Sequence, residues 1–254
     1  RISEDYKMKS FKAHLAEAGL SAERQETAFV ELVNTSVKMN NDTPITLITK
    51  EATIKNVLKA EKFEGRQESG SEPYTDVRLI TSTKIINLSM KGPSAPSLAG
   101  GGLRGIEAII PGIGAKFFRA AYDNLIKKGL SLGDKVPDTF GDLNDKDKLL
   151  LVVGNKAMGG PIHYMYIGPM DVTGKFEDGK LTVNGKCINS KKYAKSKNLY
   201  FRLRARRIDQ RFDPEASDKN NTPKIYGKSP SRGDSAGRLV VTDKKSSKGE
   251  VVVF

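Results

Sequence analysis

Asp76, Ser89 and Lys91 are the residues whose types and spacing could do chemistry together, and Glu107 follows them in the chain. Carboxylate oxygens are the ligands that Mg²⁺, a hard ion, prefers. A lysine ammonium can orient an attacking water or offset the negative charge that develops during attack on a phosphate. The chemistry open to this set is therefore the hydrolysis of a phosphodiester bond.

A β-hairpin can position the first three of these residues. Val77 and Leu79 alternate with polar neighbours, a Thr-Ser-Thr turn follows, and a second alternating segment covers residues 86–91. Because successive side chains on a strand point to opposite faces, Ser89 and Lys91 share a face, and Asp76 faces away from Val77 and Leu79. The acid and the lysine are thus expected to meet at one end of a sheet.

A second acid, Glu107, comes after a Gly/Pro/Ser-rich loop. This loop contains Gly100–Gly105, which matches G-x-G-x-x-G in form, but eight residues with two prolines separate it from the strand. A dinucleotide site needs the glycines directly between strand and helix, so the spacing disfavours that reading. The loop is either a flexible connection or a segment that packs Arg104 against a DNA backbone, where glycine permits close approach.

Glu26 is a third candidate acid. Helical periodicity begins at Ser21, and the predicted inward stripe contains Ala22, Glu26, Phe29 and Val33. A carboxylate among buried residues is costly unless it has a cation or hydrogen-bond donors. Glu26 therefore either has a structural partner or helps to bind a metal, and the sequence leaves both alternatives open.

The remaining patterns predict an α/β core over residues 1–155 and a β-rich, basic region over residues 156–254. The elements expected in the core are a strand at 44–49, a helix at 50–63, a helix from Ile113 and a buried strand at 148–154. In the second region we expect hairpins at Asp178-Gly179 and Asn184-Gly185, an aperiodic segment at 213–238, and edge strands at 240–241 and 251–254.

The strand expected at residues 199–206 carries a basic face. Its apolar residues Leu199, Phe201, Leu203 and Ala205 alternate with Tyr200, Arg202, Arg204 and Arg206. Few acids oppose these arginines in the sequence. A surface that contacts nucleic-acid phosphates is favoured over an ordinary solvated strand face.

Composition supports a polyanionic partner. The chain of 254 residues has a formal net charge of +13, and a basic surface attracts nucleic acid by counterion release. No basic amphipathic helix, transmembrane run or signal-peptide pattern indicates a membrane. The single cysteine, Cys187, excludes internal disulfides and a Cys-rich zinc site, and we expect a cytoplasmic protein.

Taken together, these motifs resemble the PD-(D/E)xK, or restriction-endonuclease-like, nuclease superfamily. That family's core is a helix with a glutamate, strands carrying an Asp and a D/E-x-K signature, then a helix and a further strand. Residues 20–155 show a similar order, with Ser89-Met90-Lys91 at the signature. Two departures exist, because no proline directly precedes Asp76 and Ser89 replaces the acid.

One branch of type II restriction enzymes looks like Asp, then Ser-x-Lys, with the missing acid supplied by the following helical region. By this resemblance Asp76 and Glu107 would bind Mg²⁺, Lys91 would position the nucleophilic water, and Glu26 would be an auxiliary acid. The implied fold is a mixed sheet flanked by helices. Which of Glu26 and Glu107 is the second metal ligand stays open.

The resulting expectation is a Mg²⁺-dependent DNA endonuclease, with RNA as the alternative substrate. By family analogy, cutting both strands would require a homodimer. The competing expectation is a noncatalytic nucleic-acid-binding or virion-associated protein. In that case Asp76 and Lys91 form an ordinary ion pair.

Overall fold

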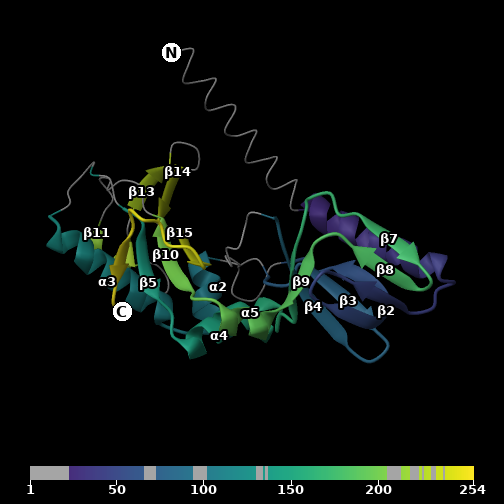
Figure 1. The fold of residues 1–254 in the computed structure, drawn as a ribbon. Helices are drawn as coiled ribbons and strands as arrows, with labels where there is room; N and C mark the ends of the chain where they lie inside the picture. The colour runs from purple at the N-terminus through teal and green to yellow at the C-terminus, as the bar shows by residue number, and fades with distance from the viewer. Residues whose placement is uncertain are drawn as a thin grey trace, which may run out of the picture. The chain divides into compact units, whose positions relative to one another are not determined.

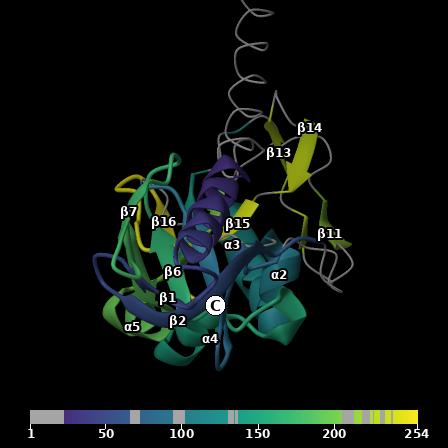
Figure 2. The ribbon, with the colours of Figure 1, turned by 90° about the vertical axis from the view of Figure 1, so that its right-hand side faces the viewer.

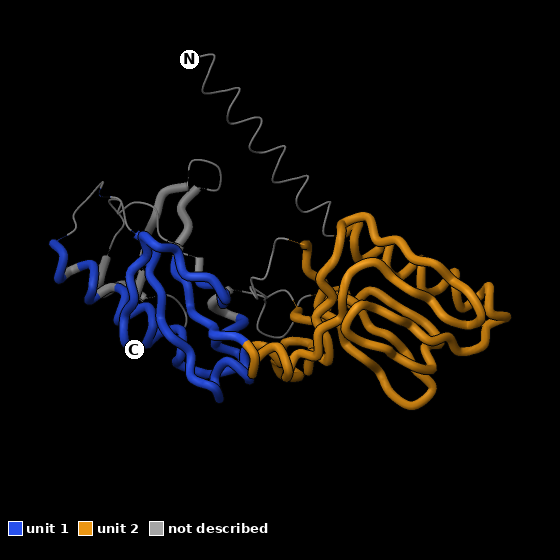
Figure 3. Tube along the Cα trace, viewed as in Figure 1, with its two compact units in different colours: residues 1–12, 97–151, 197–254 blue, residues 13–96, 152–196 orange. Residues whose placement is uncertain are grey.

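The computed structural model describes residues 23–65, 73–93, 102–129, 134, 137–204, 213–217, 223–224, 226–229, 233–236 and 238–254. Its class is α/β, as predicted, with mixed sheets and several helices. The chain divides into two compact units (Figure 3). One, the four-stranded unit, comprises residues 1–12, 97–151 and 197–254, and the other, the eight-stranded unit, comprises residues 13–96 and 152–196. This division differs from the predicted one at residue 155, because each unit combines segments from both predicted regions.

The eight-stranded unit contains one mixed sheet with the strand order β7-β8-β1-β2-β3-β4-β6-β9 (Figure 1). The β1–β8 and β4–β6 pairs are parallel, and the other pairs are antiparallel. The strands are β1 (Ile45–Ile48), β2 (Thr53–Lys62), β3 (Val77–Thr81), β4 (Ile85–Lys91), β6 (Tyr164–Ile167), β7 (Gly174–Glu177), β8 (Lys180–Val183) and β9 (Lys186–Asn189). The predicted strand at 44–49 and the predicted hairpin after Asp76 are confirmed.

The sheet curls around its own core. β8 and β9 lie far apart in the strand order, yet only Asn184 and Gly185 join them. The Cys187 N–H on β9 donates to Thr49 Oγ1, directly after β1, at 3.0 Å. The prediction of a hairpin at Asn184-Gly185 is therefore wrong, because β8 pairs with β7 and β1, whereas β9 pairs with β6.

The helix of residues 23–39 covers this core (purple in Figures 1 and 2). Its start lies outside the described residues. The side chains it buries follow helical spacing, and they are Gln25, Phe29, Val33, Ser36 and Val37. The Phe29 ring meets the edge of Tyr166, with ring centroids 5.2 Å apart. Phe29 and Val33 thus face inward as predicted, while Glu26 lies at the margin with 22% of its side chain exposed.

The helix predicted at residues 50–63 is wrong, because this segment is strand β2. Its buried apolar residues are Ile54, Val57 and Ala60, which are three residues apart and imitate a helical face. The register of β2 shifts against both neighbouring strands, and Asn56 has a left-handed φ of 58°. A bulge adds a residue to one strand, so the side-chain alternation is interrupted and the spacing lengthens.

The turn predicted at Asp178-Gly179 is confirmed. β7 and β8 pair across it, and the φ values of Asp178 and Gly179 are 49° and 71°. Two consecutive left-handed residues make the tight turn that matches the twist of a hairpin.

The four-stranded unit contains a sheet of order β15-β10-β5-β16, helices α2 and α3, and most of helix α4. Its elements are α2 (Gly102–Ile109), α3 (Ile113–Lys127), β5 (Thr139–Asp142), β10 (Tyr200–Arg204), β15 (Arg238–Thr242) and β16 (Glu250–Val252). The rings of Phe117, Phe201 and Phe254 meet in its core with centroids 5.3–5.6 Å apart. The predictions of α3 and of two late edge strands are confirmed.

The buried strand predicted at residues 148–154 is wrong, because Asp145–Val153 form helix α4. The side chain of Asn144 accepts the Asp147 N–H at 2.8 Å and donates to the Asp147 carboxylate at 2.7 Å. This cap satisfies a backbone N–H that the first helical turn leaves without a partner. The apolar residues at 148–153 fit either a strand or a helix, and the cap at Asn144 favours the helix.

The segment predicted to be aperiodic contains four short strands among its described residues. These are β11 (Asp213–Ser217) with β12 (Pro223–Lys224), and β13 (Tyr226–Ser229) with β14 (Gly233–Ala236). Within the described ranges, no helix combines the length and the apolar character that crossing a bilayer requires.

Phe29 should be a principal anchor of the helix of residues 23–39. Phe29→Ala is expected to lower the free energy of unfolding by about 3–5 kcal/mol, because it removes a fully buried ring and leaves a cavity. Urea unfolding followed by circular dichroism measures this. Met39→Ala on the same helix is the control, since Met39 is 65% exposed and its loss should change little. Equal losses in the two variants would contradict the packing described here.

Candidate active site

Asp76 lies at the entrance to β3 and is fixed by the neighbouring strand. Its N–H donates to the Leu88 carbonyl at 2.9 Å. Its Oδ2 accepts the Met90 N–H at 2.5 Å and the Ser89 hydroxyl at 3.2 Å, and it lies 3.7 Å from Lys91 Nζ. Ser89, which stands where the resemblance expects an acid, thus orients the acid that is present.

Burial raises the pKa of Asp76 above its usual value, although the Lys91 ammonium and the hydrogen bonds from Met90 and Ser89 act in the opposite direction. About a fifth of its side chain is exposed, 22% against 21% for Lys91. The carboxylate is therefore reachable from solvent but poorly solvated, which disfavours its ionised form.

Glu26 approaches this place from the helix of residues 23–39. Burial and the charge of Asp76 raise the pKa of Glu26 from 4.5 to about 7, while Lys62 and Lys91 lower it. Because the charges of Asp76 and Lys91 both act on Glu26, the three groups share one local field. Asp76, Ser89, Lys91 and Glu26, which are predicted from separate segments, are thus brought together in the eight-stranded unit.

Lys62 is a member of the site that the sequence reasoning misses. Its Nζ lies 3.9 Å from Glu26, 3.7 Å from Glu23 and 3.6 Å from Glu64, and only 21% of its side chain is exposed. Lys62 pairs with Val77 in the β2–β3 register, next to Asp76. The wrong helix at residues 50–63 hides this position, because a lysine at the end of a strand beside Asp76 would have been a candidate.

Gln25 is the second missed residue. Its side-chain amide is almost fully buried and donates to the carbonyls of Gly168 and Pro169 at 3.0 Å and of Lys91 at 3.3 Å. The amide therefore joins the helix that carries Glu26 to the ends of β4 and β6. A buried polar side chain at the start of an apolar stripe was the available signal.

Glu107 has a structural role in the four-stranded unit. It lies on helix α2. Its carboxylate accepts the Gly112 N–H at 2.5 Å and the Ala115 N–H at 3.0 Å at the start of α3. An anionic acceptor here satisfies free N–H groups and complements the helix dipole. Both carboxylate oxygens thus accept N–H groups within this unit, and within the eight-stranded unit the acid that acts on Asp76 is Glu26.

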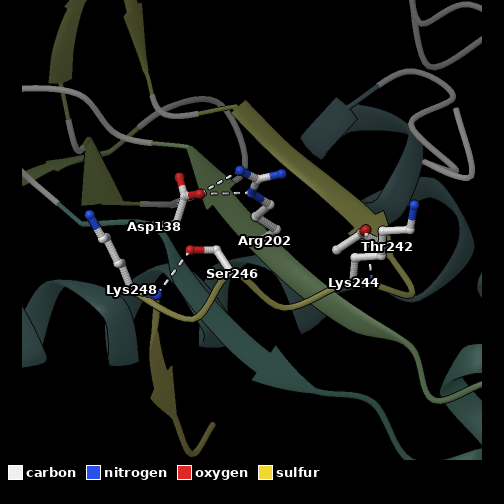
Figure 4. A network of polar contacts seen from close by, with 6 residues as sticks. All are labelled: Asp138, Arg202, Thr242, Lys244, Ser246 and Lys248. Atoms are coloured by element: carbon white, nitrogen blue, oxygen red, sulfur yellow. Dashed lines mark hydrogen bonds and ion pairs between the residues drawn. The ribbon is translucent and has the colours of Figure 1, made fainter. Parts of the chain in front are cut away.

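The basic row predicted at residues 199–206 is partly neutralised. The alternation on β10 is confirmed, since Leu199, Phe201 and Leu203 are buried. Arg202 donates through Nε to Asp138 at 3.0 Å and again through a second nitrogen (Figure 4), contrary to the expectation that few acids oppose the row. Tyr200 lies 4.2 Å below the Lys245 ammonium.

The other predicted nucleic-acid contacts cannot be placed in the same way. Arg206 and the side chains of Arg104 and Arg204 lie outside the described residues. A phosphate-contacting role for all of them stays a prediction.

The acids at the site suit Mg²⁺ better than a metal that needs many protein ligands. Among the described residues, no group of three or more His, Cys, Asp or Glu side chains is arranged to hold a metal ion. Mg²⁺ commonly keeps several waters and binds through one or two carboxylates. Asp76 and Glu26 are the two acids of this site that would hold such an ion, and a divalent cation would favour their ionised forms.

Comparison with known proteins gives no relative. No protein-family model, no curated protein and no solved structure matches the chain.

Glu26 should make the protein less stable as pH rises. Its folded-state pKa of about 7 exceeds 4.5, so between these values the folded protein binds more protons than the unfolded chain. The free energy of unfolding should therefore fall from pH 4.5 to pH 7, by at most about 3 kcal/mol from this group. Urea unfolding in EDTA measures it. Glu26→Gln should be more stable than wild type at pH 8 and nearly equal at pH 4.5, whereas Glu31→Gln, at an exposed position on the same helix, should not differ.

Gln25 should stabilise the site through its hydrogen bonds. Gln25→Leu leaves three carbonyls without this donor and is expected to lower the free energy of unfolding by about 1–3 kcal/mol, equally at pH 5 and pH 8. Thr35→Leu, at an exposed position on the same helix, is the matched control. An unchanged unfolding midpoint for Gln25→Leu would refute this role.

Proposed function

We propose that this chain is a Mg²⁺-dependent endonuclease acting on DNA, with a restriction-endonuclease-like core. The observation that carries the proposal is the convergence of Asp76, Glu26 and Lys91 from three separate segments. The charge of Asp76 contributes to the raised pKa of Glu26, and the Lys91 ammonium lies 3.7 Å from the Asp76 carboxylate. Phosphodiester hydrolysis uses this combination of acids and a cation.

The order of the elements supports the same fold. A helix carries Glu26, Asp76 begins β3, and β4 carries Ser89 and Lys91. Helices α2 and α3, which belong to the four-stranded unit, follow in the chain with β5 and α4, and the chain then returns to the eight-stranded sheet as β6, which is parallel to β4. The further strand of the resemblance is therefore Tyr164–Ile167, in place of the segment at residues 148–154.

Each residue of the site has a defined role in this proposal. Asp76 and Glu26 would hold Mg²⁺, which when bound supplies Lewis-acid stabilisation of the charge on the phosphate. Met90 N–H and the Ser89 hydroxyl hold the Asp76 carboxylate in one orientation. Lys91 presents its ammonium beside that carboxylate, where it can orient the attacking water or stabilise developing negative charge.

Glu26 also fixes the expected pH dependence. A protonated carboxyl group is a poor ligand, and burial raises the pKa of Glu26 to about 7. Cleavage activity at limiting Mg²⁺ should therefore rise as the pH increases through about 7. Over the same pH range the free energy of unfolding of the metal-free protein should fall.

A noncatalytic nucleic-acid-binding or virion-associated protein is the second candidate. The observation that favours it is the balance of charge, because Lys91 pairs with Asp76 and Lys62 pairs with Glu26. In that case the cluster braces β2, β3 and β4 against the helix and never binds a metal. The net charge of +13 accommodates either candidate.

Cleavage of supercoiled plasmid with Mg²⁺ or EDTA tests the proposal. Asp76→Ala and Lys91→Ala should lower the rate by about 100-fold or more, since each removes a group used in the reaction. Glu26→Gln should lose activity likewise, whereas Glu107→Gln should keep it and only weaken the start of α3. Lys59→Ala is the control, because its ion pair with Glu61 is exposed.

Three outcomes contradict parts of the proposal. Cleavage that survives both Asp76→Ala and Lys91→Ala removes this site. Loss of cleavage in Glu107→Gln but not in Glu26→Gln makes Glu107 the second acid. A wild-type protein that binds DNA and cuts neither plasmid nor RNA with Mg²⁺ favours the noncatalytic candidate.

A further inference from the structure

Helix α5 (Ser190–Ser196) holds three lysines in a fixed place on the eight-stranded unit. The Asn189 side chain accepts the Lys192 N–H at 3.1 Å and so caps the helix. Tyr193 and Ala194 are buried beneath it. The exposed side chains are Lys191, Lys192 and Lys195.

The three lysines line an open hollow of about 500 Å³ together with Asn189 and Ser196. None of these lining residues is a large apolar side chain. The hollow therefore offers ammonium and amide donors, and it lacks the aromatic platform on which a base would stack.

Among the described residues, the lysines of α5 differ from others in the same unit in having no carboxylate partner. Lys62, Lys91 and Lys186 each lie within 4.0 Å of an acid, whereas within the described part of the chain no ion pair involves the three lysines that line the hollow. Their positive charge is therefore uncompensated, and it favours an anionic ligand.

His163 lies within reach of this positive charge. Its Nδ1 accepts the Asn87 N–H at 3.0 Å, and its carbonyl accepts the Ser190 N–H at the start of α5. Burial lowers the pKa of His163, and the charges of Lys84 and Lys191 lower it further. The positive potential of this surface thus extends to the edge of the sheet.

We propose that the α5 hollow binds phosphate groups of a nucleic-acid backbone. Ammonium groups contact phosphates as point charges, so the binding is independent of base sequence. The absence of large apolar side chains from the lining favours this polyanion over a membrane surface, where amphipathic segments bury apolar residues.

The place of the hollow in the sheet assigns it to the same substrate as the candidate active site, a step that rests on the proposed function. Strands β4, β6 and β9 are neighbours in the sheet. One row across them is Lys91, Ile167 and Lys186, and another row is Leu88, Tyr164 and Asn189. Asn189 is therefore three residues and two strands from Lys91, about 14 Å between Cα atoms. Phosphates of one strand repeat every ~3.4 Å along a duplex, so a backbone that contacts both Lys91 and Asn189, at the start of the hollow, would span about four nucleotides.

Fluorescence anisotropy of a labelled 30-base-pair duplex, titrated with full-length protein in EDTA at several salt concentrations, tests binding without cleavage. The variant is Lys191→Gln/Lys192→Gln/Lys195→Gln. The control is Lys38→Gln/Lys59→Gln/Lys175→Gln, which removes the same charge from exposed positions of the same unit. The hollow variant should lower the slope of log affinity against log salt by about 2–3, at about 0.9 for each lost phosphate contact, and the control by less than about 1.

Equal salt slopes for the two triple variants would overturn the assignment. It would also be overturned if the hollow variant lost binding to phosphatidylserine vesicles but kept its binding to DNA. Circular dichroism checks that both variants are folded. The cleavage assay separates this inference from the proposed function. If the wild-type protein binds DNA with the expected difference in slope but does not cut, the proposed endonuclease activity fails and the phosphate-binding hollow stands. If the wild-type protein cuts DNA and the hollow variant has an unchanged salt slope, only the phosphate-binding hollow fails.

Discussion

The burial of Asp76 and Glu26 beside Lys91 and Lys62 is the constraint on which the eight-stranded unit depends. Taking carboxylates out of water is costly unless cations and hydrogen-bond donors replace the lost solvation. Backbone and side-chain groups of β4 provide the donors for Asp76, and the two lysines provide the charge. The lysines replace the lost solvation only in part, since the pKa values of both acids stay raised, so the apolar core has to hold the helix of residues 23–39 and the strands in place.

The apolar core holds these charged groups in register. Phe29 is buried against Tyr166, one helical turn after Gln25 and Glu26, so the packing of one face of the helix sets the position of the other. The Gln25 amide adds directional contacts to the ends of β4 and β6. Because these contacts join segments distant in the sequence, the geometry of the site forms only when the sheet has closed.

The parts of this fold that follow local rules could be predicted from the sequence. The alternation on β4 placed Ser89 and Lys91 on one face, and the Asp178-Gly179 turn defined its hairpin. β2 could not be predicted, because a bulge near Asn56 spaces its buried residues as a helix would. Residues 148–153 could not be assigned from their apolar run alone, since the cap from Asn144 decides between strand and helix.

The site was predictable in part for the same reason. Asp76 and Lys91 lie on strands whose facing can be read from periodicity, and their meeting was predicted from that facing. Glu26 was placed with them only by the family resemblance. Lys62 was hidden by the misassigned β2, and the polar contacts of Gln25 depend on loop carbonyls after β6 that no sequence pattern reveals. Glu107 follows the motif at the expected distance, yet its carboxylate caps α3, because an acid shortly before a helix also serves that helix.

The pKa values of the two acids bear on which function the cluster serves. In an ion-pair network that only stabilises the fold, the cations outweigh burial and lower the pKa of each carboxyl group. Here burial outweighs Lys62 and Lys91, and the pKa values of both Glu26 and Asp76 are raised. Lys62 is also shared with Glu23 and Glu64, which dilutes its effect on Glu26. The fold therefore holds two acids whose ionised forms burial disfavours despite the neighbouring lysines, and the proposed cation site rests on this property.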